Sequence, residues 1–65
     1  MRGSELREIR EKQDITVQEL ASYIGVSRGV IYYTEGMDKV DMKVKTFKDW
    51  MVALGLDPSK EIKKL

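Results

Sequence analysis

The stretch Leu20–Gly36, LASYIGVSRGVIYYTEG, decides how this 65-residue chain folds. Apolar residues recur at helical spacing as far as Gly25, the glycine interrupts the pattern, and a second helical pattern starts at Ser27. Glycine tolerates the left-handed conformation in which many helices end, and serine is a preferred cap for the helix that follows. The spacing therefore predicts two helices, at about 17–24 and 28–35, joined by a short turn.

The residues before this stretch predict how the first of the two helices begins. Thr16 can accept a hydrogen bond from the N–H of Glu19, and Glu19 can accept one from the N–H of Thr16, which is the pattern of a capping box. An apolar stripe follows at positions i, i+3, i+4 and i+7: Val17, Leu20, Ala21 and Ile24. Further upstream, 4–13 predicts a short amphipathic helix with Leu6 on its apolar face and Arg7 on its solvated face.

The segment 37–45, MDKVDMKVK, has a different pattern. Val40, Met42 and Val44 alternate with charged residues. Such alternation is typical of a short strand or of an extended loop that buries every second side chain, and we favour the loop.

The remaining residues predict two more helices and most of the bulky core. Apolar residues at helical spacing, Trp50 among them, predict a buried helical stripe made by Phe47, Trp50, Met51 and Leu54. Thr46 and Asp49 resemble a capping pair for this helix, and Gly55 is the expected stop. Asp57 and Pro58 then suit the start of a last short helix, whose apolar residues are Ile62 and Leu65. We expect an all-α fold, a compact bundle of about five short helices in a single domain, 1–65.

Composition excludes several classes of function. The chain contains no cysteine and no histidine, which excludes disulfides, thiol nucleophiles and thiolate or imidazole metal sites. Twelve basic against eleven acidic residues give a formal net charge of +1, so any nucleic-acid site must come from the placement of charges. We expect no enzyme, no cofactor, no metal and no small-molecule ligand.

The apolar runs of the sequence are short. None is long enough to span a bilayer, and the N-terminal residues MRGSELREIREK lack the apolar stretch of a secretion signal. We therefore expect a cytoplasmic protein without a membrane partner.

Small residues stand where the two central helices would meet. Two helices that cross steeply through a short turn need a small side chain at their contact and a glycine at the turn, and Ala21 and Gly25 supply them. At this point the sequence LREIREKQDITVQELASYIGVSRGVIYYTEG resembles the first three helices of the Cro and phage-repressor (XRE) helix-turn-helix family. The resemblance extends to Pro58, because TFKDWMVALGLDP is similar to the family's fourth helix and the turn after it.

The resemblance implies a function and a set of site residues. In this family the third helix lies in the DNA major groove and its N-terminal residues read base edges. Carried over by position, the DNA-facing residues are Ser27, Arg28, Gly29, Tyr32 and Tyr33. Val17 stands where family members commonly carry a phosphate-contacting glutamine, and Gln18 follows it.

Individual roles follow from the chemistry of these side chains. Arg28 can pair with guanine, Gly29 lets the backbone approach the groove closely, and Tyr32 and Tyr33 can touch thymine methyls or phosphates. Lys39 and Lys43 are candidate phosphate contacts of the segment 37–45. The resemblance thus implies a double-stranded DNA-binding transcriptional regulator, of the repressor type found in phages, plasmids or mobile elements, that binds a two-fold operator as a homodimer.

Other interpretations stay open at the sequence level. Tyr32 and Tyr33 suit a half-buried core or a dimer interface as well as DNA, and Arg28 suits a solvated first turn. A protein-interaction module on the same fold, such as an antitoxin or anti-regulator, would grip its partner with Tyr32, Tyr33 and Val17. In a further DNA-binding variant, the segment 37–45 would form a small wing on the backbone.

Overall fold

The protein is all-helical in the part of the chain that its computed structural model describes, residues 1–61. Five helices follow one another along these residues: α1 (Gly3–Lys12), α2 (Val17–Ile24), α3 (Arg28–Glu35), α4 (Val44–Ala53) and α5 (Pro58–Glu61). The predicted all-α bundle is confirmed, with the second and third helices at the predicted positions. The predicted apolar residues of the last helix, Ile62 and Leu65, lie outside the described residues.

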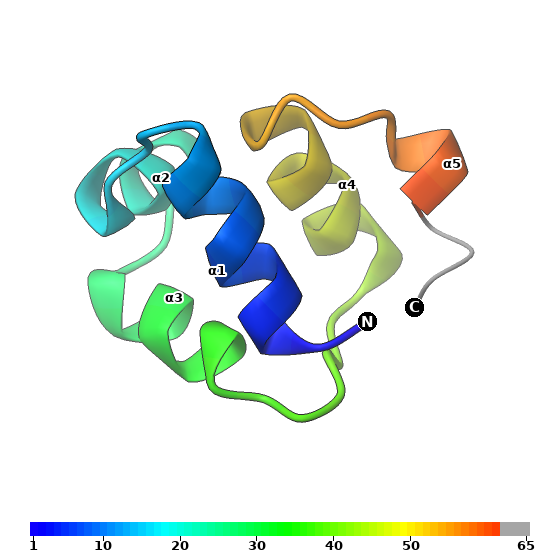
Figure 1. Ribbon diagram of the computed structural model, residues 1–65, viewed down its shortest axis with the longest axis horizontal. Helices are drawn as coiled ribbons and strands as arrows, with labels where there is room; N and C mark the ends of the chain where they lie inside the picture. The colour runs from blue at the N-terminus through cyan, green and yellow to red at the C-terminus, as the bar shows by residue number, and fades with distance from the viewer. Residues whose placement is uncertain (62–65) are drawn as a thin grey trace.

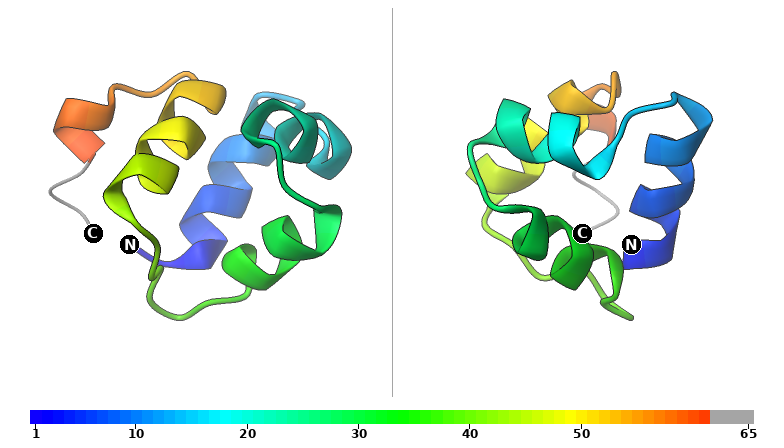
Figure 2. Two further views of the ribbon diagram at one scale, coloured as in Figure 1. Left: turned by 180° about the vertical axis from the view of Figure 1, so that it is seen from behind. Right: turned by 90° about the vertical axis from the view of Figure 1, so that its left-hand side faces the viewer.

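Two pairs of helices lie at opposite ends of the molecule, and α1 lies between them. In Figure 1, α2 and α3 lie at one end, α4 and α5 lie at the other, and α1 crosses in front of them. Seen from behind, α4 and α3 lie on either side of α1 (Figure 2). The helix pairs in contact are α2 with α3, α2 with α4, α1 with α3, and α4 with α5. Among the helices of residues 1–61, none has the length and apolar character needed to cross a membrane.

One hydrophobic core joins these helices. Its largest fully buried side chains are those of Trp50 and Phe47, and α4 also contributes Met51, with Leu54 directly after it. The predicted stripe of the fourth helix is therefore confirmed as the bulky part of the core. The other buried apolar residues come from α1, α2, α3 and the loop before α4: Leu6, Val17, Leu20, Ala21, Ile31 and Val40. Ile24, predicted to be buried with α2's stripe, is only partly buried against this cluster.

The helix-turn-helix is fixed by local hydrogen bonds. The predicted capping box is present, since Thr16 Oγ1 accepts from the Glu19 N–H and Glu19 Oε1 accepts from the Thr16 N–H, each at 3.0 Å. At the other end of α2, Gly25 adopts the left-handed conformation with φ of 85° and ψ of 35°. Its N–H and that of Val26 donate to the Ala21 carbonyl at 2.8 and 3.0 Å. Ser27 then occupies the N-cap of α3, although its side chain makes no capping bond.

The start of α1 is packed directly onto the end of α3. Gly3 is buried, and a Cβ atom added there would overlap the backbone at Thr34 and Glu35. The Gly3 N–H donates to the Met37 carbonyl at 2.8 Å, and the Val40 N–H donates to the Met1 carbonyl at 2.9 Å. The N-terminal residues thereby hold the loop that leaves α3.

Two predictions for the region before α4 are wrong. The capping pair Thr46 and Asp49 does not form the helix start, because α4 begins at Val44 with Lys43 as its N-cap and no side-chain capping bond. Burial of Val40 anchors the loop, so the chain enters the helix soon afterwards. Val44 is consequently a helical residue, 48% exposed, and not part of the predicted alternation. The favoured loop is confirmed over 37–43, where the structure has no regular helix or strand.

Candidate nucleic-acid interface

The outer face of α3 carries the residues that the sequence assigns to DNA. Arg28, Gly29, Tyr32 and Tyr33 are all exposed. On the inner face, Ile31 and Thr34 are buried. The Thr34 hydroxyl donates to the Val30 carbonyl at 2.8 Å, so this buried polar side chain is satisfied within its own helix.

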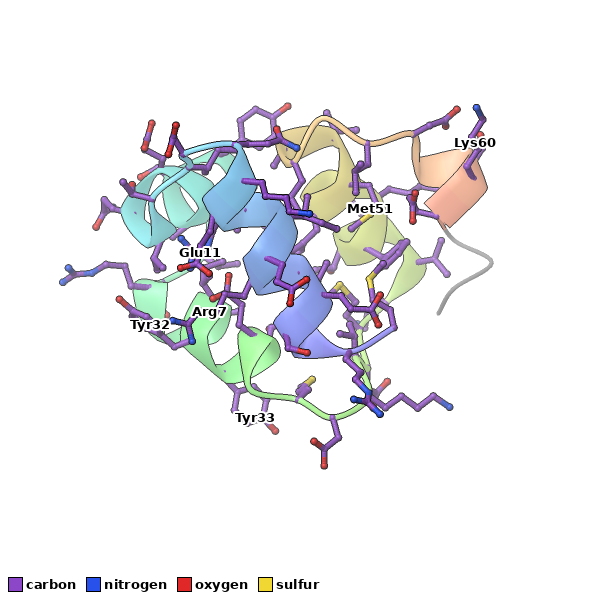
Figure 3. The ribbon with its side chains drawn as sticks, viewed as in Figure 1. Arg7, Glu11, Tyr32, Tyr33, Met51 and Lys60 are labelled. Carbon is purple, nitrogen blue, oxygen red and sulfur yellow. The ribbon has the colours of Figure 1, made fainter. Side chains whose placement is uncertain are left out.

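A groove runs along one side of α3, where this helix meets α1 and the beginning of α2. Three of the predicted site residues line it together: Gln18, Arg28 and Tyr32. Figure 3 shows the Tyr32 side chain next to that of Arg7, whereas Tyr33 extends from the lower edge of α3. Ser27, Gly29 and Tyr33 do not line the groove.

The charged residues of the groove are unevenly balanced. Arg7, Arg10 and Arg28 line the groove with one carboxylate, that of Glu35, and Arg7 also pairs with Glu11 beside the groove. Three arginines are therefore balanced by two carboxylates, which leaves an excess of one positive charge at the groove. Such a local excess attracts polyanions even when the overall charge is close to zero.

Arg10 and Glu35 form a buried ion pair at the base of the groove, 25 positions apart in the sequence. Arg10 Nε donates to Glu35 Oε2 at 2.7 Å, a second guanidinium nitrogen donates to Oε1 at 3.2 Å, and Arg10 Nη1 donates to the Ile15 carbonyl at 2.9 Å. The two side chains are 10% and 6% exposed. The hydrogen bonds to Glu35 raise the pKa of Arg10 above its ordinary value. This pair joins α3 to α1, and Arg7 and Arg28 are the exposed arginines of the groove.

Arg7 is the groove residue that the sequence interpretation missed, because it was placed on the solvated face of α1. Its Nε lies 3.4 Å from Glu11 Oε1 in an exposed ion pair one helical turn apart. Such exposed pairs contribute little to stability and exchange readily with other partners. The available signal was the spacing of Arg7 and Arg10, which puts both on one side of the first helix.

The beginning of α2 closes one end of the groove. Thr16, Val17 and Gln18 line it, and the first N–H groups of a helix carry partial positive charge that favours anions. The Gln18 amide donates to Ser22 Oγ at 3.1 Å, which keeps this exposed side chain along the helix. Hydrogen bonds with the backbone and side chain of Thr16 lower the pKa of Glu19.

The two predicted loop lysines lie elsewhere. Lys39 and Lys43 are exposed in the loop between α3 and α4, and neither lines the groove. If they contact DNA, they do so separately from Arg7, Gln18 and Arg28.

Two of the alternatives left open by the sequence conflict with the structure. Tyr32 and Tyr33 are 63% and 72% exposed, so neither is a half-buried core residue. Val17 belongs to the hydrophobic core and is 9% exposed, so little of its side chain is available to grip a partner. Val30, which the sequence interpretation left unassigned, is 43% exposed on α3.

Comparison with known proteins gives a family match for the segment that carries most of this groove. Residues 6–35 match the family model described as helix-turn-helix. No curated protein and no solved structure matches the chain. The matched segment runs from Leu6 in α1 to Glu35 at the end of α3, so it includes the capping box, the turn at Gly25 and the exposed face of α3. The match supports the resemblance of residues 6–35 to the Cro/C1-type (XRE) helix-turn-helix, a family of DNA-binding regulators.

Proposed function

We propose that the protein is a sequence-specific regulator of transcription that binds double-stranded DNA with α3 in the major groove. The observation that carries the proposal is the joint placement of an exposed recognition helix and an arginine-rich groove beside it, on the matched helix-turn-helix. Base contacts specify a site, whereas phosphate contacts position the protein. This one surface offers residues for both tasks.

The residues divide between these two tasks by their position. Arg28 is the first residue of α3, where side chains reach base edges, and its guanidinium can pair in bidentate fashion with guanine O6 and N7. Arg7 and Gln18 line the same groove, and we assign them to contacts with the DNA backbone. Lys39 and Lys43 remain proposed backbone contacts of the loop.

Repression and dimerisation are the finer parts of the proposal. A single short recognition helix makes few base contacts, and two copies on a two-fold operator double them. Each subunit of this homodimer would be a single domain, 1–65. The simplest way for it to regulate transcription is to occupy an operator, because this action needs no catalytic residue. Repressors of phages, plasmids and mobile elements act in this way.

The salt dependence of DNA binding tests the proposal. Binding to a fluorescent duplex should weaken steeply as salt rises, because each phosphate contact releases counterions. Arg7→Ala, Lys39→Ala and Lys43→Ala should each lower the slope of log affinity against log salt by about one for every phosphate that the removed side chain neutralised. Lys60→Ala is the matched control, since α5 lies at the opposite end of the molecule from α3 (Figure 3).

The same titration separates the competing function. A protein-interaction module would use Tyr32 and Tyr33, whose exposure favours this alternative, and would show no steep salt-dependent binding to duplex DNA. Absence of such binding at low salt would overturn the DNA-binding proposal. An unchanged slope for one lysine or for Arg7 would remove that residue from the backbone contacts.

A further inference from the structure

The exposed face of α3 has two chemically different sides. Arg28 and Tyr32, one helical turn apart, line the groove that contains Arg7. Val30 and Tyr33, three residues apart, are exposed but do not line it. Side chains at this spacing are neighbours on a helix surface, so they make a second, apolar side of α3, which we call the Val30–Tyr33 patch.

The polar groups that α3 could use to read bases are few. Its sequence, RGVIYYTE, contains no Asn, Gln, Asp or Lys, so the usual partners of adenine are missing. The Glu35 carboxylate is held by Arg10, and the Thr34 hydroxyl is bonded to a carbonyl within its helix. Arg28, the tyrosine hydroxyls and the hydroxyl of Ser27 just before α3 are what remains for hydrogen bonding to base edges.

An apolar patch on a recognition helix has one apolar counterpart in the major groove. The C5-methyl group of thymine is the apolar group that base pairs present there. Gly29 lies between the two sides of α3, and a Cβ added to it would meet nothing closer than Ser27 Oγ at 3.8 Å. The helix surface beside Val30 is therefore low and open, so the edges of base pairs can approach it.

We propose that the Val30–Tyr33 patch reads thymine methyl groups, and that Val30 is a specificity-determining residue next to the guanine contact of Arg28. The inference rests on the proposed function and names the class of operator it takes: half-sites with thymine beside guanine. The arginines on the other side of α3 support DNA as the occupant of the patch, because backbone contacts there place the same helix against base edges.

Replacing thymine with deoxyuridine tests the inference, because it removes the methyl group and leaves the hydrogen-bonding edge unchanged. The duplex that the protein selects from random DNA is substituted one thymine at a time. Affinity should fall about four-fold for each methyl group that Val30 or Tyr33 covers, as expected for burial of one methyl-sized group. Thymines outside the half-sites should tolerate the change.

Variants connect the effect to the patch. Val30→Ala should bind thymine and deoxyuridine duplexes with nearly equal affinity at the position that wild type discriminates. It should also fold normally, because alanine is the better helix former at an exposed position. Val52→Ala is the matched control, since Val52 is a similarly exposed valine on α4, and it should discriminate as wild type does.

The outcomes distinguish this inference from the proposed function. Equal affinity of the wild-type protein for thymine and deoxyuridine duplexes, or a selected sequence without thymine in its half-sites, overturns the inference and leaves DNA binding standing. Discrimination that persists unchanged in both Val30→Ala and Tyr33→Ala also overturns it. Absence of binding to any duplex overturns the proposed function itself.

Discussion

Gly3 and Gly29 both lie in the first turn of a helix, but the space around them differs. A Cβ at Gly3 would overlap the backbone at Thr34 and Glu35, whereas one at Gly29 would meet only Ser27 Oγ at ordinary contact distance. Gly3 is thus required by the contact of α1 with α3. Nothing within the described residues requires a glycine at Gly29, where an exposed helix position would favour alanine.

Alanine at these two positions should have opposite effects on stability. Gly29→Ala should raise the free energy of unfolding by up to about 1 kcal/mol, the helix propensity difference between the residues, and should weaken DNA binding if the groove wall comes close to α3. Gly3→Ala should destabilise the fold, because the new methyl group would overlap the backbone at Thr34 and Glu35, and backbone atoms move aside less easily than the end of a side chain. Melting temperature and affinity for the selected duplex, measured on the same samples, check both. Unchanged or tighter binding by Gly29→Ala would show that the glycine does not make room for DNA.

At the scale of single elements, α2 is the helix whose start is most fully determined by its own residues. The capping box of Thr16 and Glu19 satisfies two N–H groups at the beginning of the helix. Thr16 also lines the groove beside α3. Loss of the cap should therefore affect both the stability of the fold and the lining of the groove.

The capping box should make stability depend on pH in the acid range. The pKa of Glu19 is lowered in the folded protein, so its contribution is present above the pKa of the unfolded chain and is lost as pH falls through the folded value. Thr16→Ala should cost about 1 kcal/mol at neutral pH. Glu19→Gln, which keeps the box without a titrating group, should remove this part of the acid dependence. Urea unfolding of wild type, Thr16→Ala and Glu19→Gln at several acidic pH values measures this dependence of stability on pH. An identical acid dependence in Glu19→Gln and wild type would contradict this account.

Elements with local signals could be predicted from the sequence, and those determined by distant contacts could not. The cap at Thr16 and the stop at Gly25 act within a few residues, so both ends of α2 were predictable. The start of α4 was not, because buried Val40 and its bond to Met1 determine where the chain turns into that helix.

The site shows the same division between local and distant contacts. The resemblance to the helix-turn-helix family assigned Arg28, Tyr32 and Tyr33 to the outer face of α3, and all three are exposed there. It could not reveal that Arg7 faces Arg28 across a groove, because that arrangement depends on how α1 packs onto α3. Val30 was overlooked for a related reason: an apolar residue in a helical pattern predicts burial, and only the fold shows that this one is exposed.

At the scale of the whole molecule, the Arg10–Glu35 pair joins the first and last helices of the matched segment. Its guanidinium also holds the Ile15 carbonyl just before α2, so one side chain connects α1, the approach to α2, and α3. The Gln13 amide makes a further connection, donating to the Leu54 carbonyl at the end of α4. Together these bonds hold α3 and α4 in fixed positions relative to α1.

Replacing one partner of the Arg10–Glu35 ion pair should lower the free energy of unfolding more than replacing both partners. Glu35→Leu or Arg10→Met alone leaves an unpaired buried charge and should destabilise by about 3 to 5 kcal/mol, enough to unfold much of a domain of this size. The double variant Arg10→Met/Glu35→Leu should be more stable than either single variant. Guanidinium unfolding of the four proteins gives the coupling between the two sites. If the double variant loses as much unfolding free energy as the two single variants together, the ion pair does not act as one unit that holds α3 against α1.

Selection from random duplex DNA, run in parallel with wild type and Arg28→Ala, tests the central claim that α3 reads base sequence in the major groove. Wild type should enrich a two-fold motif with a guanine at the same position of each half-site. Arg28→Ala should enrich the same motif with that position relaxed, because a bidentate arginine–guanine pair contributes about 1 to 3 kcal/mol of discrimination. Failure of wild type to enrich any motif, or an identical motif from both proteins, would contradict the assignment of α3 and Arg28.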